Sequence, residues 1–101
     1  MLEKVRLIEK KYRELEARLA QPETYGNIEA VTALNRELRE LAPLAEAYRR
    51  YRRQEAALQE AEALLADPEL RPLAEESAGE ARAAMAAAEE EMKVLLLPRD
   101  P

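Results

Sequence analysis

Apolar residues recur every three or four positions along almost the whole chain, and this spacing constrains the fold more than any other feature. Near the N-terminus the steps are 3, 3, 4, 3 and 4, which place six side chains on one face of a helix. Ala, Glu, Leu, Arg and Lys account for 71 of the 101 residues, a composition typical of long helices and coiled coils. The pattern therefore predicts amphipathic helices, the first of which carries a stripe of Leu2, Val5, Ile8, Tyr12, Leu15 and Leu19.

Proline and glycine indicate where the first helix ends and the second begins. The first helix should end near Ala20, because residues 21–27 bring together a proline, a glycine and an asparagine. We expect a loop there, with Asn27 as the N-cap of the second helix. The second stripe consists of Ile28, Val31, Leu34, Leu38, Leu41, Ala45, Tyr48, Tyr51, Leu58, Ala61 and Leu65.

Pro43 interrupts the second stripe. It has no amide hydrogen, and its ring clashes with the carbonyl group of Arg39. We therefore expect the middle helix to be kinked or broken near Pro43, at residues 41–43. The stripe resumes in phase after the proline, which favours a kink over a long loop.

The third helix begins near Asp67 and Pro68, an N-cap followed by a proline in the first turn. Pro72 cannot donate to the carbonyl group of Pro68, so a separate first turn is the alternative, with the long helix starting near Pro72. Pro98 and Pro101 end the helix, whose stripe we place at Leu73, Ser77, Ala81, Met85, Ala88, Met92 and Leu95.

Short connections between three helical segments favour antiparallel neighbours. We therefore expect an all-α fold, an elongated antiparallel bundle of three long helices with coiled-coil-like packing. The middle helix is much longer than the first, so part of its apolar face could lack a partner within the chain. Self-association through that face is an expectation that follows.

The formal net charge of −5 argues against nucleic-acid binding through a general positive field. One local cluster differs, and it consists of Arg49, Arg50, Arg52 and Arg53. Arginine beside Tyr48 and Tyr51 suits phosphate contact and base stacking. The two tyrosines also lie on the apolar stripe, where they would pack inward and leave the arginines to pair with Glu46 and Glu55. The cluster is therefore either a solvated, salt-bridged face or a contact with ribonucleic acid.

The chain has no Cys and no His, which excludes a thiol nucleophile, a disulfide, an imidazole base and the usual zinc sites. The carboxylates of Glu89, Glu90 and Glu91 point about 100° apart on a helix and cannot converge on one cation. We expect no catalytic residue, no cofactor and no metal. Tyr25 should plug the end of the bundle, with a partner contact as the alternative. No apolar run suits a membrane span or a signal peptide, so we expect a cytoplasmic protein without a membrane partner.

Four segments occur in order along the chain: EKKYRELEARL (residues 9–19), EAYRRYRR (46–53), LLADPEL (64–70) and VLLLPRDP (94–101). Together they resemble the N-terminal domain of bacterial peptide chain release factor 1, a family of class I release factors. The last segment is the most specific, because the family's first domain passes into its second at a similar sequence. The resemblance covers the whole chain but only the first part of a family member.

The resemblance implies a translation termination factor that, when intact, recognises UAA and UAG on the ribosome and promotes peptidyl-tRNA hydrolysis. The family's Gly-Gly-Gln tripeptide cannot occur in a chain whose only glycines are Gly26 and Gly79. Its Pro-x-Thr codon-reading tripeptide is also absent, since Pro22-Glu23-Thr24 lies outside the matching region. The implied partners are the ribosome near its stalk base and the termination machinery, including the recycling GTPase. Methylation of the intact factor acts on the absent tripeptide.

We therefore predict that residues 1–101 are a single helical domain, the first domain of a longer release factor, without its codon-reading and Gly-Gly-Gln domains. This domain would not be an enzyme. The resemblance transfers no contact residue, so the four arginines remain the candidate contact with the ribosome or another partner. A free-standing helical adaptor or oligomerisation module is the alternative that the apolar stripes leave open.

Overall fold

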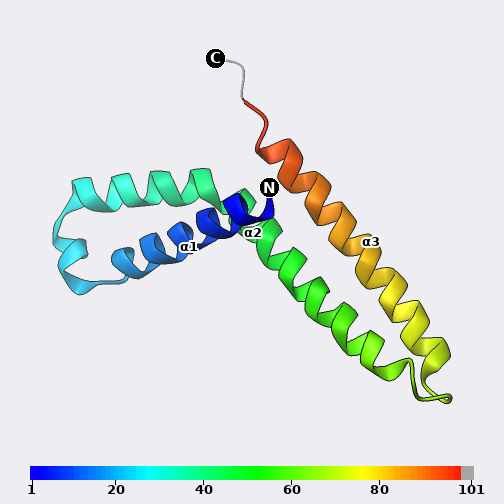
Figure 1. The fold of residues 1–101 in the computed structure, drawn as a ribbon. Coiled ribbons are helices and arrows are strands. Elements are labelled where there is room, and N and C mark those ends of the chain that lie inside the picture. Colours follow the sequence, from blue (N-terminus) through cyan, green and yellow to red (C-terminus); the bar gives the residue numbers. More distant parts are fainter. Residues whose placement is uncertain (99–101) are drawn as a thin grey trace. The chain divides into compact units, whose positions relative to one another are not determined.

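The structure, a computed structural model, describes residues 1–98, and within them every regular element is helical. The elements are α1 (Leu2–Leu19), the short 3-10 helix η1 (Pro22–Gly26), α2 (Ile28–Leu64) and α3 (Arg71–Leu95) (Figure 1). The predicted all-α fold with three long helices is confirmed. The last three residues of the VLLLPRDP segment, and with them Pro101 as a helix end, lie outside the described residues.

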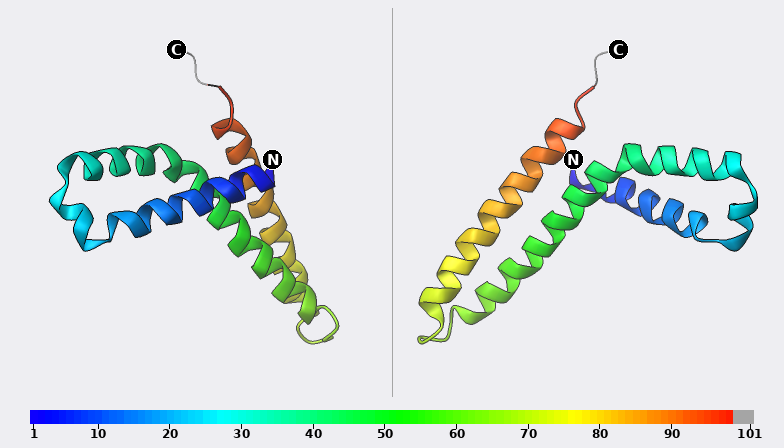
Figure 2. Two further views of the ribbon diagram at one scale, coloured as in Figure 1. Left: turned by 60° about the vertical axis from the view of Figure 1, so that its left-hand side comes forward. Right: turned by 180° about the vertical axis from the view of Figure 1, so that it is seen from behind.

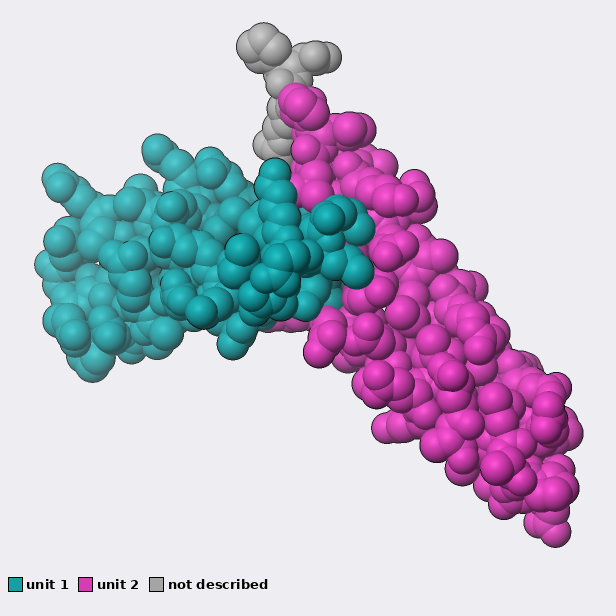
Figure 3. Space-filling view, in the orientation of Figure 1, with its two compact units in different colours: residues 1–48 teal, residues 49–101 magenta. Residues whose placement is uncertain are grey.

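The chain forms two compact units, Met1–Tyr48 and Arg49–Pro101 (Figure 3). Each unit contains an antiparallel helical hairpin. In the first unit α1 lies alongside the N-terminal part of α2, and in the second unit α3 lies alongside the C-terminal part of α2 (Figures 1 and 2). Both parts of the middle helix therefore have a partner within their own unit, which corrects the expectation that a stretch of its apolar face lacks one.

The first unit is built on the stripe predicted for α1. Val5 and Leu15 are completely buried, and the other four stripe residues are half-buried. Leu34 and Ala45 of α2 are also buried. Ile28 was predicted to join them, but it is 80% exposed, because it starts α2 at the end of the hairpin, where α1 has already ended.

The second unit is built on alanine. Most of the buried and half-buried residues of α3 follow one another at steps of 4, 3, 4, 3, 4 and 3, the heptad spacing of coiled coils. The predicted stripe was wrong at its start, because Leu73 is 63% exposed and Ser77 is also exposed. Successive steps of four residues rotate the face by about 40° each, whereas alternating steps of three and four keep it in place. The observed seam of α3, which we call the alanine seam, consists of Ala74, Ala78, Ala81, Met85, Ala88, Met92 and Leu95.

The helix starts follow their capping residues. The Asn27 side-chain oxygen accepts a hydrogen bond of 3.1 Å from the amide of Ala30, which confirms the predicted N-cap. Asp67 Oδ1 accepts a 2.9 Å hydrogen bond from the amide of Glu69, yet α3 begins only at Arg71. The alternative of a separate first turn before Pro72 is therefore confirmed. The expected loop at residues 21–27 contains η1.

Pro43 lies inside α2, which continues without a break on both sides of it. Of the two predicted alternatives, a kink or a break, the break is therefore absent from α2. Leu41 and Leu44 are half-buried and Ala45 is buried, so apolar packing on either side keeps these residues helical. The missing amide leaves the carbonyl group of Arg39 without its usual helical donor.

Candidate functional site

The four predicted arginines lie in the C-terminal part of α2, where it enters the second unit, and the structure separates their roles. Arg50 forms an ion pair with Glu91 of α3. Arg52 pairs with Glu55 one turn later on the same helix, at 2.6 Å, as expected for a solvated face. Arg49 is half-buried, whereas Arg53 is exposed.

Two of these arginines line a groove between α2 and α3. It encloses about 320 Å³. Arg50, Arg53 and Gln54 contribute from α2, and Glu91 lies on the α3 side. Its remaining lining residues are small, namely Ala84, Ala87 and Ala88. We call this the arginine groove.

The two arginines of the arginine groove differ in whether an acidic side chain pairs with them. Glu91 fixes and partly neutralises the guanidinium group of Arg50. Arg53 makes no ion pair within the part of the chain that the structure describes. A guanidinium group presents a planar set of donors that matches phosphate or carboxylate oxygens. The groove can therefore bind an anionic group through Arg53, with Arg50 held nearby.

The tyrosines next to the cluster pack inward, as predicted. Tyr48 is half-buried and Tyr51 is buried. The buried ring of Tyr51 is not available to stack on a nucleotide base. The nucleic-acid interpretation then relies mainly on contact with phosphate groups.

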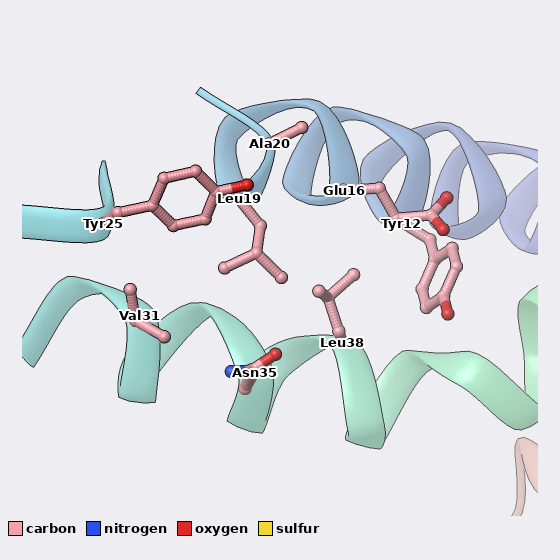
Figure 4. A pocket seen from close by; sticks show the side chains of 8 residues that line it. All are labelled: Tyr12, Glu16, Leu19, Ala20, Tyr25, Val31, Asn35 and Leu38. Carbon is pink, nitrogen blue, oxygen red and sulfur yellow. The ribbon is translucent and has the colours of Figure 1, made fainter. Parts of the chain in front are cut away.

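A second groove lies in the first unit, between α1, η1 and the start of α2, and encloses about 530 Å³ (Figure 4). Tyr25 reaches from η1 toward Leu19, with Val31 on the opposite side. Tyr25 is 67% exposed, so it does not plug the hairpin end as expected. The lining is mainly apolar and holds a single carboxylate: Tyr12, Glu16, Leu19, Ala20, Tyr25, Val31, Asn35 and Leu38. It offers no paired acid and base for catalysis.

Further ion pairs lie on the exposed surfaces of the helices. Arg6 donates to Glu3 at 2.6 Å, and this hydrogen bond holds the pKa of the Glu3 carboxyl below its ordinary value. The same contact raises the pKa of Arg6. Both side chains are exposed. These shifts therefore reflect a helical i,i+3 pair and not a buried reactive site.

Among residues 1–98, Glu9 is the buried carboxylate. Glu9 lies on the packed side of α1 and accepts a 2.9 Å hydrogen bond from Arg13. Within residues 1–98 no group of three or more acidic side chains is placed to hold a metal ion. No helix in the same residues has the length and apolar character needed to cross a membrane.

Sequence reasoning missed Glu91 as the partner of Arg50, and it missed Ala84 and Ala87 as part of the arginine groove. Glu91 is 41 positions away from Arg50, so no local spacing connects them. The available signal was the heptad register of α3. Because Ala88 and Met92 are in the seam, Glu91 must flank it on the side of α2.

Comparison with known proteins finds one matching family and several relatives. The PCRF domain family matches residues 8–101. Peptide chain release factor 1 of Geotalea uraniireducens (strain Rf4) is 42% identical over 101 residues, which are 100% of this chain and 28% of that protein. The protein of the same name from Geobacter sulfurreducens is 41% identical over the same shares. That of Caldicellulosiruptor saccharolyticus is 38% identical over 104 residues, 100% of this chain and 29% of that protein.

The chain thus spans somewhat over a quarter of the length of the curated relatives it matches. No solved structure matches it. The family match covers α1 from Ile8 onward and the whole of α2 and α3. On this match, the chain belongs to the PCRF domain family.

Proposed function

We propose that the chain is the N-terminal domain of a translation termination factor. The intact factor would recognise UAA and UAG on the ribosome in the cytoplasm and promote peptidyl-tRNA hydrolysis. One observation carries this proposal: the whole chain is about 40% identical to proteins named peptide chain release factor 1, and it aligns with little more than a quarter of each.

The domain itself is proposed to be non-catalytic. A Gly-Gly-Gln tripeptide cannot be formed by two glycines that stand at positions 26 and 79. Each of the two grooves described above is lined by a single carboxylate, Glu16 in one and Glu91 in the other, without a second carboxylate beside it to form an acid–base pair. Its role is then to bind and position, and the chemistry belongs to other parts of the factor.

A domain exchange tests the proposal. Residues 1–101 replace the matching first part of the Geobacter sulfurreducens relative, and release of formylmethionine from ribosomes is measured at UAA, UAG and UGA. We expect the chimera to match the unchanged relative at UAA and UAG, and the chain alone to release nothing. The control is the relative without its first part. A chimera that is no more active than this truncated control would contradict the proposal.

The arginine groove is proposed as a ribosome contact that binds RNA phosphates. Support comes from the exposed guanidinium group of Arg53, which has no ion pair within residues 1–98, and from Arg50, which Glu91 holds beside it. Arg52 contributes less because Glu55 already neutralises it. Arg49 is half-buried and also contributes less.

Salt dependence of ribosome binding tests this contact. Each phosphate contact adds roughly 0.7 to 0.9 to the slope of log affinity against log salt concentration. Arg53→Ala should therefore lower that slope by about this amount, and Arg53→Lys should preserve it. Arg36→Ala, at another exposed position of α2, is the matched control. An equal slope for the Arg53→Ala variant and the wild-type chain would remove Arg53 from the interface.

The alternative function, a free-standing adaptor or oligomerisation module, makes a different prediction. Both parts of α2 already have a helical partner within their units, so the chain has less need of a second copy. Light scattering of the chain at micromolar concentration distinguishes the two. A monomer supports the termination-factor domain, and a stable oligomer favours the adaptor.

A further inference from the structure

Arg50 and Glu91 connect the two helices of the second unit across the arginine groove. Their ion pair joins α2 to α3, and their side chains are 43% and 47% exposed. A pair that is this open to solvent can be reached by a dissolved anion, and its two side chains can separate at small cost. The pair is therefore an exchangeable contact in the groove and not part of the buried core.

Among the described residues that line the groove, Glu91 is the one acidic side chain. The two glutamates before it in the sequence are engaged elsewhere. Glu90 pairs with Lys93 at 3.3 Å, and Glu89 lines a separate groove between α2 and α3. Of these three consecutive carboxylates, it is the third that lies where it meets an arginine of the groove.

A carboxylate and a phosphate present similar acceptor oxygens to a guanidinium group. In the chain alone, Glu91 occupies donors of Arg50 that a phosphate would use, so the two anions compete. The groove contains two arginines and one glutamate, a formal charge of +1, which would be +2 without the carboxylate. Arg53 lies one helical turn from Arg50, so one RNA strand could bring phosphates to both arginines if the carboxylate were absent.

We propose that Glu91 is a specificity-determining residue of the arginine groove, an internal competitor that keeps Arg50 from binding RNA phosphates in general. The groove then binds one phosphate, at Arg53, and binds a second only where the RNA displaces Glu91. Short unstructured RNA offers no further contacts to offset that displacement, so the chain binds it weakly. This inference rests on the proposed function and deepens it, because it concerns which RNA the same groove accepts.

Salt-dependent binding to a labelled RNA tests the competition. The chain is titrated onto a short fluorescein-labelled oligouridylate, and the affinity is measured by fluorescence anisotropy at several salt concentrations. Glu91→Gln should bind about two- to fivefold more tightly at low salt. Its slope of log affinity against log salt concentration should be steeper by about 0.7, the contribution of one phosphate contact on a single strand. A slope equal to that of the wild-type chain would overturn the proposal.

Two controls separate competition at Arg50 from a change in net charge. Glu89→Gln changes the net charge by the same amount on the same helix, but its side chain lines the other groove, so the slope should stay that of the wild-type chain. In a chain that carries Arg50→Ala, Glu91→Gln should no longer steepen the slope, because the guanidinium group that it would release is missing. Circular dichroism checks that all variants stay helical. An equal gain in either control would contradict the competition.

The ribosome-binding assay for Arg53 separates this inference from the proposed contact. If Arg53→Ala lowers the salt slope on ribosomes but Glu91→Gln gains nothing on oligouridylate, the contact stands and the competition fails. If Glu91→Gln gains a phosphate contact but Arg53→Ala leaves the slope on ribosomes unchanged, the competition stands and the ribosome contact at the groove fails.

Discussion

Gly79 lies at an exposed position within α3. A Cβ atom added there would have no atom within 4 Å, so alanine fits without a clash. Glycine in a helix interior is about 1 kcal/mol less favourable than alanine. Gly79→Ala should therefore raise the free energy of unfolding by about that amount, as measured by urea denaturation. Gly26→Ala, in η1, is the control outside the long helices, and an equal gain there would contradict a helix-specific effect.

The ion pair of Glu3 and Arg6 makes a prediction about pH. Because its folded-state pKa is lowered, the carboxylate contributes stability that is present above its unfolded pKa and is lost as pH falls through the folded pKa. An NMR titration of the Glu3 carboxyl should find its midpoint below the ordinary glutamate value. Arg6→Gln should return the midpoint to that value, and so should high salt, because the pair is exposed. A midpoint that ignores both changes would contradict the pairing.

At the residue level, the candidate site was predictable only where contacts are local. Spacing along one helix gave the pair of Arg52 and Glu55, and the apolar stripe gave the inward positions of Tyr48 and Tyr51. The partner of Arg50 was expected nearby, at Glu46 or Glu55, but is Glu91 of another helix. Such a pair depends on the register between two helices, which the spacing within each helix does not define.

Helix starts depend on a few capping atoms. Asn27→Ala removes the side-chain oxygen that accepts a hydrogen bond from the amide of Ala30. One of the amides in the first turn of α2 then has no acceptor. We expect a loss of about 1 kcal/mol in the free energy of unfolding, measured by thermal or urea denaturation. Gln21→Ala is the control, because Gln21 precedes η1 without a side-chain cap and should change stability little.

The existence of each helix was easier to predict than which of its faces is buried. The α1 stripe was correct at every position, because its mixture of steps of three and four residues keeps all six side chains on a single face. At the start of α3, two sets of residues one position apart could form the buried face. We chose the set with Leu73, because leucine is larger and more apolar than Ala74, which is the buried residue. Burial went to the smaller residue because the heptad register of the later turns, through Ala81, Ala88 and Met92, determines which face meets α2.

At the scale of the molecule, each unit has its own buried core. Met92 is completely buried in the second unit, and Leu15 is completely buried in the first. Met92→Ala should lower the free energy of unfolding by about 2 to 5 kcal/mol. Hydrogen exchange should accelerate most in α3 and in residues 49–64, and less in α1. Leu15→Ala should give the mirror-image pattern. Equal acceleration throughout the chain in both variants would contradict two separate cores.

The division into two units could not be inferred from periodicity. The stripe of α2 continues in phase through Pro43, and a regular stripe states only that some partner covers it. It does not state that α1 covers the first part and α3 the second. Helix number and type follow from local chemistry, whereas the choice of partner depends on the lengths of α1 and α3 and on where the connections fall.

The alanine seam of α3 restricts how this chain can change over generations. A single base change in an alanine codon yields only Val, Gly, Ser, Thr, Pro, Asp or Glu. At Ala74, Ala78, Ala81 or Ala88, each of these brings a branch, a hydroxyl group, a charge, a helix breaker or excess backbone freedom into a buried seam. Accepted mutations should therefore accumulate on the outer face of α3. In a library selected for folding, these four alanine codons should show almost only synonymous changes.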